Sequence, residues 1–143
     1  TSLMTYITLE IRQRVSDAAK HRCGYCQTQE AVIGMPLEIE HIVPEAAGGS
    51  SEEHNLWLAC PRCNQHKGAK THAIDEQTGE HVPLFNPRIQ HWEEHFMWEK
   101  EGLYIVGLTP TGRATVTALQ MNNPFVVYSR QVWIAWGWHP PRD

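Results

Sequence analysis

The chain contains two short cysteine motifs, Cys23-Gly-Tyr-Cys26 and Cys60-Pro-Arg-Cys63, which enclose the stretch Glu40-His41-Ile42-Val43-Pro44. Two residues separate the cysteines of each motif, a spacing at which one turn of backbone presents two thiolates to a single tetrahedral metal ion. The two motifs use all four cysteines of the chain. We therefore predict a structural zinc site that frames a second, different site in the enclosed segment.

The composition is that of an ordinary globular protein, with 143 residues of which 20% are charged and 41% hydrophobic. One domain over residues 1–143 is the default at this length. No segment approaches the roughly 18 consecutive apolar residues of a membrane span. The start, Thr1 to Tyr6, has no basic region followed by an apolar run, so we expect no signal peptide. These features predict a cytoplasmic, reducing setting, where paired cysteines bind metal rather than form disulfides.

The formal net charge of −4 argues against a protein that coats nucleic acid through its overall charge. The positive charges nevertheless gather in two places. Arg62, Lys67 and Lys70 accompany the second cysteine motif. An earlier group comprises Arg12, Arg14, Lys20 and Arg22. Either group could form a local basic face for phosphates, and a solvated surface is the alternative, for the earlier group in particular.

The first half of the chain predicts a helix followed by a ββα unit. Residues 8–21 have helical periodicity with Thr8 as the N-cap, and the side predicted to be buried comprises Leu9, Ile11, Val15, Ala18 and Ala19. Residues 36–43 alternate apolar and polar side chains, as a half-buried strand does, and Pro44 ends the run. A turn over residues 48–51 leads to a returning strand over residues 55–59. Pro61 suits a first helical turn, so residues 62–70 are predicted to be a short helix.

The second half of the chain differs in composition from the first. Residues 73–82 are polar and contain glycine, which predicts a loop or linker. Residues 83–143 form a C-terminal extension that is rich in tryptophan, with helices predicted over residues 90–98, 111–121 and 124–136 and a strand over residues 103–108. Because this extension is too apolar to stand alone in water, we expect it to pack on the ββα unit. The predicted fold class is α+β.

The enclosed segment suggests hydrolysis of a phosphodiester, which needs a base for the attacking water and a cation for the developing charge. His41 ends the alternating strand beside Glu40, and an imidazole accepts protons near neutral pH. Neighbours on an extended strand point to opposite faces. Glu40 and His41 can therefore serve one site only if the strand is bulged or turns at this point.

The order and spacing of these residues resemble an HNH endonuclease of the four-cysteine type with a ββα-metal active site. The resemblance runs from Cys23 to about Thr71, and its core motif spans residues 23–71. It is carried by Leu37-Glu38-Ile39-Glu40-His41-Ile42-Val43-Pro44, Gly48-Gly49, Asn55-Leu56, Leu58-Ala59-Cys60-Pro61-Arg62-Cys63-Asn64 and Lys67-Gly68. The extension is similar to the segment that lies after this motif in some small stand-alone members.

The resemblance implies a role for each site residue. His41 is implied as the general base, and Glu40 as a metal ligand where the family usually has Asp. Asn55 is implied to hydrogen-bond the backbone of the loop that carries the base. Asn64 stands where many relatives have a His ligand, with His66 as the alternative. Oxygen donors from Glu40 and Asn64 favour Mg²⁺ or Mn²⁺, whereas the four thiolates leave their zinc no open position for chemistry.

The expected activity is metal-dependent endonuclease cleavage of DNA, most naturally double-stranded. Arg62, Lys67 and Lys70 are expected to bind flanking phosphates, with a solvated helix face as the alternative. Two other functions stay open. One is a non-catalytic zinc-stabilised module that binds DNA or a protein. The other is a cutting subunit of a larger defence or mobile-element complex. A homodimer is also compatible with the sequence.

Overall fold

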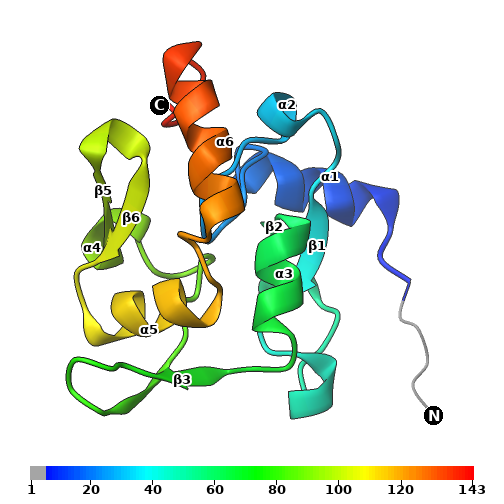
Figure 1. Ribbon diagram of the computed structural model, residues 1–143. Helices are drawn as coiled ribbons and strands as arrows, with labels where there is room; N and C mark the ends of the chain where they lie inside the picture. Colours follow the sequence, from blue (N-terminus) through cyan, green and yellow to red (C-terminus); the bar gives the residue numbers. More distant parts are fainter. Residues whose placement is uncertain (1–5) are drawn as a thin grey trace.

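The computed structural model describes residues 6–143, which form helices and three two-stranded antiparallel sheets (Figure 1). This mixture, together with a cluster of four cysteines, confirms the α+β class. Five of the six residues used for the signal-peptide prediction lie outside the described residues. Within residues 6–143, every helix is too short or too polar to cross a membrane.

Helix α1 (Leu9–Ala18) begins as predicted, because the Thr8 hydroxyl accepts a hydrogen bond from the first turn at 3.2 Å. Val15 and Ala19 are buried as expected. Leu9 is 66% exposed and Ala18 is also exposed, so the predicted buried side was too wide. The physical reason is that α1 packs mainly on one strand, β2, and buries only the narrow strip that faces it.

The ββα unit has the predicted order. Strand β1 (Glu38–His41) pairs antiparallel with β2 (Leu56–Ala59), and helix α3 (Pro61–Lys67) follows. The short helix α2 (Glu30–Ile33) precedes β1, and two 3-10 turns, η1 (Glu45–Ala47) and η2 (Glu53–Asn55), lie between the strands. All three main elements are shorter than predicted, because regular pairing and helical bonding stop where the chain turns.

The predicted loop over residues 73–82 is instead a hairpin of β3 (His72–Ile74) and β4 (His81–Pro83). Its turn is closed by Asp75, whose carboxylate accepts hydrogen bonds from the Thr78 hydroxyl and from Arg113. The polar, glycine-containing composition therefore belongs to a tight turn between short strands.

The predicted helix over residues 90–98 is also wrong in its second half. Helix α4 (Trp92–His95) is one turn long, and the chain continues as strand β5 (Phe96–Glu99). β5 pairs with β6 (Tyr104–Gly107) across the 3-10 turn η3 (Lys100–Gly102) and buries Phe96. A strand forms because its pairing partner lies a few residues ahead, a non-local factor that helical periodicity does not register.

The last two helices form where they were predicted. Thr109 is the N-cap of α5 (Pro110–Ala118) and Asn123 is the N-cap of α6 (Pro124–Ala135), and each helix has a proline in its first turn. The extension packs on the ββα unit, since one buried cluster contains Tyr25 and Leu58 together with Phe85, Phe96 and Ile105. The Trp92 indole also donates a hydrogen bond to the Tyr25 carbonyl at 2.7 Å.

Candidate functional site

The four cysteines form a compact, buried cluster. Their sulfur atoms all lie within 4.8 Å of one another, and none is in a disulfide. Cys26 Sγ and Cys60 Sγ are 3.6 Å apart. Four Zn–S bonds of about 2.3 Å in a tetrahedron place the sulfurs about 3.8 Å apart. The geometry therefore fits the predicted zinc site and leaves no coordination position for a substrate.

Each cysteine motif is tied to the ββα unit through its backbone. The Gly24 N–H donates to the Leu58 carbonyl of β2 at 2.8 Å. A side chain at Gly24 would collide with the Trp57 indole, so this close approach requires glycine. On the other side, Cys60 is the N-cap of α3, and its sulfur accepts a hydrogen bond from the Cys63 N–H. A zinc ion here would therefore join the segment after α1 to β2 and α3.

Arg62 faces the cysteine cluster rather than a phosphate-binding surface. Its guanidinium Nη2 donates to Cys26 Sγ at 3.5 Å. Hydrogen bonds from the other cysteines lower the pKa of Cys26, and the Arg62 charge adds to this effect. The predicted phosphate contact of Arg62 stays a prediction, and the contact that the structure gives its guanidinium is with Cys26. Its positive charge instead offsets the negative charge that four thiolates would place around a zinc ion.

His41 is the last residue of β1, and 21% of its side chain is exposed. Its Nε2 lies 2.9 Å from the Ser51 hydroxyl and 3.4 Å from Glu45 Oε1. Both partners belong to the loop between the strands. The hydroxyl and the carboxylate thus approach the same ring nitrogen, and the side chain stays partly exposed to solvent.

Asn55 closes the loop that carries these partners. Its Oδ1 accepts from the Val43 N–H at 2.9 Å, and its Nδ2 donates to the Val43 carbonyl at 2.9 Å and to the Ser50 carbonyl at 2.7 Å. Gly49 lies so close to the Val43 carbonyl that any side chain there would collide with it. The amide thus pins both ends of the loop and brings Ser51 against His41. These are the backbone contacts that the resemblance implied for Asn55.

Glu40 lies on the other side of the strand and is buried. Its carboxylate pairs with the Lys67 ammonium at 2.8 Å and accepts the Tyr25 hydroxyl at 2.8 and 2.9 Å. Burial raises the pKa of Glu40, whereas Lys67, Tyr25 and the charge of His41 act in the opposite direction. The Lys67 ammonium also donates to the His41 carbonyl at 3.1 Å and the Ile42 carbonyl at 2.9 Å. Three oxygens therefore surround this one cation.

Residues 23–70 match the family model of the HNH endonuclease. This segment is an HNH motif. The match covers the span over which the resemblance was predicted, and it includes the four cysteines, Glu40, His41, Asn55 and Asn64. No curated protein and no solved structure matches the chain. The matched segment, called the HNH segment below, covers about a third of the chain, and its similarity to an endonuclease family suggests an activity related to nucleic acid.

Strand β1 has no bulge that would bring the side chains of Glu40 and His41 to the same face. Pairing is regular through Glu40↔Trp57 and His41↔Leu56, so the two side chains leave opposite faces of β1. The chain bends only after His41, at residues 42 and 43. Asn64 donates from Nδ2 to Glu38 Oε1 at 2.8 Å, and its hydrogen-bond partner is therefore Glu38 rather than Glu40.

The oxygen atoms near Glu40 are the candidate ligands of the predicted catalytic divalent ion. Among residues 6–143, the four cysteines are the one group of His, Cys, Asp and Glu side chains close enough together to hold an ion. The oxygens around Glu40 nevertheless already enclose a cation, the ammonium of Lys67. Carboxylate and amide oxygens are the ligands that Mg²⁺ and Mn²⁺ prefer. The donors of Glu40 and Asn64 fit such an ion in kind.

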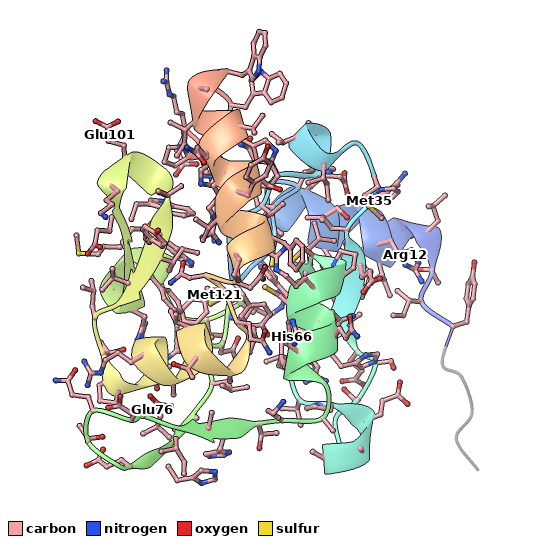
Figure 2. The ribbon with its side chains drawn as sticks, in the orientation of Figure 1. Arg12, Met35, His66, Glu76, Glu101 and Met121 are labelled. Carbon is pink, nitrogen blue, oxygen red and sulfur yellow. The ribbon has the colours of Figure 1, made fainter. Side chains whose placement is uncertain are left out.

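The remaining basic residues are largely paired. Lys67 is buried and paired with Glu40, and its predicted phosphate contact stays a prediction. Lys70 is exposed and donates to the His66 carbonyl at 2.8 Å; Figure 2 shows His66 on α3. In the earlier group, Arg14 pairs with Glu10 and Glu53, and both Lys20 and Arg22 pair with Asp143. These pairs agree with the solvated-surface alternative for that group.

Several residues at this site were not anticipated. Tyr25 sits between the first two cysteines and binds Glu40, and Glu38, two positions before Glu40, binds Asn64. Glu45 and Ser51 flank the His41 ring. Only Glu38 had a sequence signal, because strand alternation places it on the same face as Glu40. The other three are brought in by folding of the loop and of the first cysteine motif.

Proposed function

We propose that the HNH segment is a metal-dependent endonuclease that hydrolyses phosphodiester bonds of double-stranded DNA, with His41 as general base. The observation that supports this most strongly is the position of His41 and the contacts of its ring. A partly exposed imidazole stands at the end of β1, and its Nε2 lies beside Ser51 and Glu45 of the loop that Asn55 fixes with three hydrogen bonds. Such a ring is positioned to take a proton from water near neutral pH.

Each neighbour of the ring has a part in this proposal. His41 takes the proton of the attacking water, which makes the ring cationic, while the water oxygen bonds to phosphorus and the bond from phosphorus to the leaving oxygen breaks. The leaving oxygen takes up a proton from solvent. The Glu45 carboxylate, 3.4 Å from Nε2, then stabilises the imidazolium. The Ser51 hydroxyl keeps the ring in its orientation, and Asn55 acts as a positioning residue through the loop backbone. General base catalysis of this kind contributes about 10²–10⁴-fold to a rate.

Glu40 and Asn64 are the proposed ligands of a catalytic ion, with His66 as the alternative to Asn64. Because Glu40 and His41 leave opposite faces of β1, the proposal also requires the end of this strand to bend when substrate and ion bind, so that the base and the ion reach one phosphodiester. A bound Mg²⁺ or Mn²⁺ supplies stabilisation of the charge that develops on the phosphate and the leaving oxygen. Because Lys67 now neutralises Glu40, its ammonium must leave the carboxylate before a divalent ion is held there. The released ammonium then becomes free for the phosphate contact predicted for Lys67, beside the exposed Lys70.

A plasmid-nicking assay tests the proposal. Supercoiled plasmid is incubated with zinc-loaded protein in the presence of Mg²⁺ or Mn²⁺ and, in parallel, without any added divalent ion. We expect nicking only with the added ion, and a loss of at least about 10²-fold in His41→Ala. The matched control is His54→Ala, because His54 is an exposed histidine of the same loop. Undiminished cutting by His41→Ala, at equal zinc content, would show that another group is the base.

A second function is favoured by one specific observation, the buried pair of Glu40 and Lys67. If the ammonium never leaves, the HNH segment is a zinc-stabilised module that binds DNA or a protein without cutting. Gel-shift binding of the plasmid DNA by wild-type protein, with no nicking in any divalent ion, would support that function. Nicking that appears only after a partner complex is added would instead identify a cutting subunit.

A further inference from the structure

Helix α6 presents an unusual face to the outside of the molecule. Phe125, Tyr128, Val132 and Trp136 are 87%, 69%, 41% and 69% exposed. Their spacing of three, four and four residues places them on one side of the helix. Trp138 is 50% exposed and stacks on Trp136 with ring centroids 5.9 Å apart. We call these five residues the outer stripe. α6 projects at the top of the view in Figure 1.

The opposite face of α6 is firmly packed, so the outer stripe is not a face that could turn inward. Val126 and Arg130 are buried there. The Arg130 guanidinium donates to the carbonyls of Leu103 and Met121 and to Asn122 Oδ1. Arg130 is the one charged residue of α6. The exposed side of the helix therefore carries no charge, and a contiguous apolar surface of this kind on a protein commonly marks an interaction site.

The area and the charge of the outer stripe indicate what covers it. With about 150–250 Å² per aromatic side chain, the exposed fractions amount to roughly 600 Å². A standard protein interface buries about 800 Å² on each partner, so the stripe and its rim are large enough for a dimer. Nucleic acid would require several cations on this face to meet its phosphates, whereas α6 exposes none and Arg142 lies only at the rim, where it lines a pocket with Trp138.

A second copy of the chain also satisfies the charge requirement. Each copy has a formal net charge of −4, so most pairs of surfaces would bring like charges together. The outer stripe is uncharged, so two copies that meet through it do not bring like charges together there. A two-fold contact requires a patch that complements itself. The stripe meets this condition because it has an aromatic residue near each end, Phe125 and Trp136, with Tyr128 and Val132 between them.

We propose that two copies of this chain associate through the outer stripe, with their α6 helices antiparallel about a two-fold axis. In this arrangement Phe125 of each copy packs near Trp136 of the other, and Tyr128 and Val132 lie close to the axis. The contact covers the exposed aromatic face and leaves His41 and its loop untouched, because these belong to the ββα unit. The dimer is therefore expected whether or not the HNH segment cuts DNA.

Sedimentation velocity over roughly 1–100 µM protein tests this contact, a range suited to an interface of modest area. We expect the wild-type particle to approach twice the 16.4 kDa mass of one chain. Phe125→Glu and Trp136→Glu, which bury a carboxylate in the contact, should each weaken the dimer at least about 10-fold. The matched control is Leu9→Glu, because Leu9 is 66% exposed on α1, away from the outer stripe, and its substitution should leave the dimer intact.

Three results would overturn the proposal. One is a wild-type particle of single-chain mass up to the highest concentration. Another is a dimer that both substitutions leave unchanged, which would place the contact elsewhere. The third is a single-chain particle whose tryptophan fluorescence is quenched by single-stranded DNA, lost in Trp136→Glu, which would make the stripe a stacking surface. If a glutamate variant loses its zinc or its cooperative unfolding, Phe125→Ser and Trp136→Gln are measured instead, with the same expected loss of dimer.

Discussion

Asn55 shows how much of the candidate site depends on one uncharged side chain. Its amide satisfies two groups of Val43 and one carbonyl at Ser50. Without it, three buried or partly buried backbone groups lose their partner, and each unsatisfied group of this kind costs about 1–3 kcal/mol. The loop would then no longer hold Ser51 and Glu45 against the ring of His41.

We therefore expect Asn55→Ala to lower the free energy of unfolding by about 1–3 kcal/mol and to reduce nicking as well. Urea unfolding at fixed zinc content measures the first effect and the plasmid assay measures the second. Asn55→Asp is the matched variant, because its carboxylate can still accept from Val43 N–H but can no longer donate to either carbonyl. Wild-type stability in both variants would contradict this role of Asn55 in the loop.

Glu40 and Lys67 form a buried ion pair, with only 1% and 3% of their side chains exposed. Removing one partner leaves the other charged and buried, which typically costs about 3–5 kcal/mol. Glu40→Gln and Lys67→Met should therefore each destabilise the protein strongly. The double variant should lose much less than the two single losses combined, because no uncompensated charge is left. Urea unfolding of all four proteins gives this comparison, and additive losses would mean that the two groups do not interact.

Among the elements, the ββα unit could be predicted because several local signals coincide there. Alternation marks β1, Pro44 ends it, and Pro61 opens α3 next to a cysteine motif whose spacing restrains the turn. The β3–β4 hairpin and β5 were missed for one shared reason. Each exists only because a partner strand lies further along the chain, and the composition of a four-residue strand does not reveal that partner.

The candidate site was predictable to a similar extent. The position of His41 at a strand end and the contacts of Asn55 follow from the motif. The directions of Arg62 and Lys67 did not follow from it, because a short helix presents its basic residues on all sides and packing selects which turn inward. Lys67 lies on the side of α3 that meets Glu40, and Arg62 lies on the side that meets the cysteines.

The segment after α6 is anchored to the β5–β6 hairpin through His139. This ring is buried, its Nε2 bonds to the Gly102 carbonyl at 3.0 Å, and Trp98 and Trp133 pack against it edge-on. Burial lowers the pKa of His139 from its ordinary value near 6.5 to about 4. As the pH falls below 6.5, the unfolded chain therefore binds a proton that the folded protein does not bind until about pH 4.

The free energy of unfolding should accordingly decline between pH 6.5 and 4 and be unaffected by this residue above pH 6.5. His139→Gln, which can keep the donor to Gly102, should lack this part of the decline. Urea unfolding of both proteins at about pH 7.5 and about pH 5.5 isolates the effect, since acid loss of zinc is common to the two. Equal declines in the two proteins would show that His139 is not held neutral by the fold.

In the molecule as a whole, the cysteine cluster lies where the three main parts meet. It receives the chain from α1, contacts β2 through Gly24, caps α3 through Cys60, and belongs to the same buried cluster as Phe85 and Phe96 of the extension. The HNH segment is therefore braced on one side by the extension and on the other by α1. This arrangement explains how so short a segment can keep the loop between β1 and β2 in place.

The proposed chemistry depends on one divalent ion that binds to Glu40 and Asn64 in the HNH segment, apart from the zinc. Crystals soaked with Mn²⁺ test this most directly, by anomalous diffraction at the manganese and zinc edges. We predict a zinc peak among the four cysteines and a manganese peak between Glu40 and Asn64, with the Lys67 ammonium withdrawn from the carboxylate. Manganese found only at the cysteines, or a Lys67–Glu40 pair unchanged in saturating Mn²⁺, would contradict the proposed ion site.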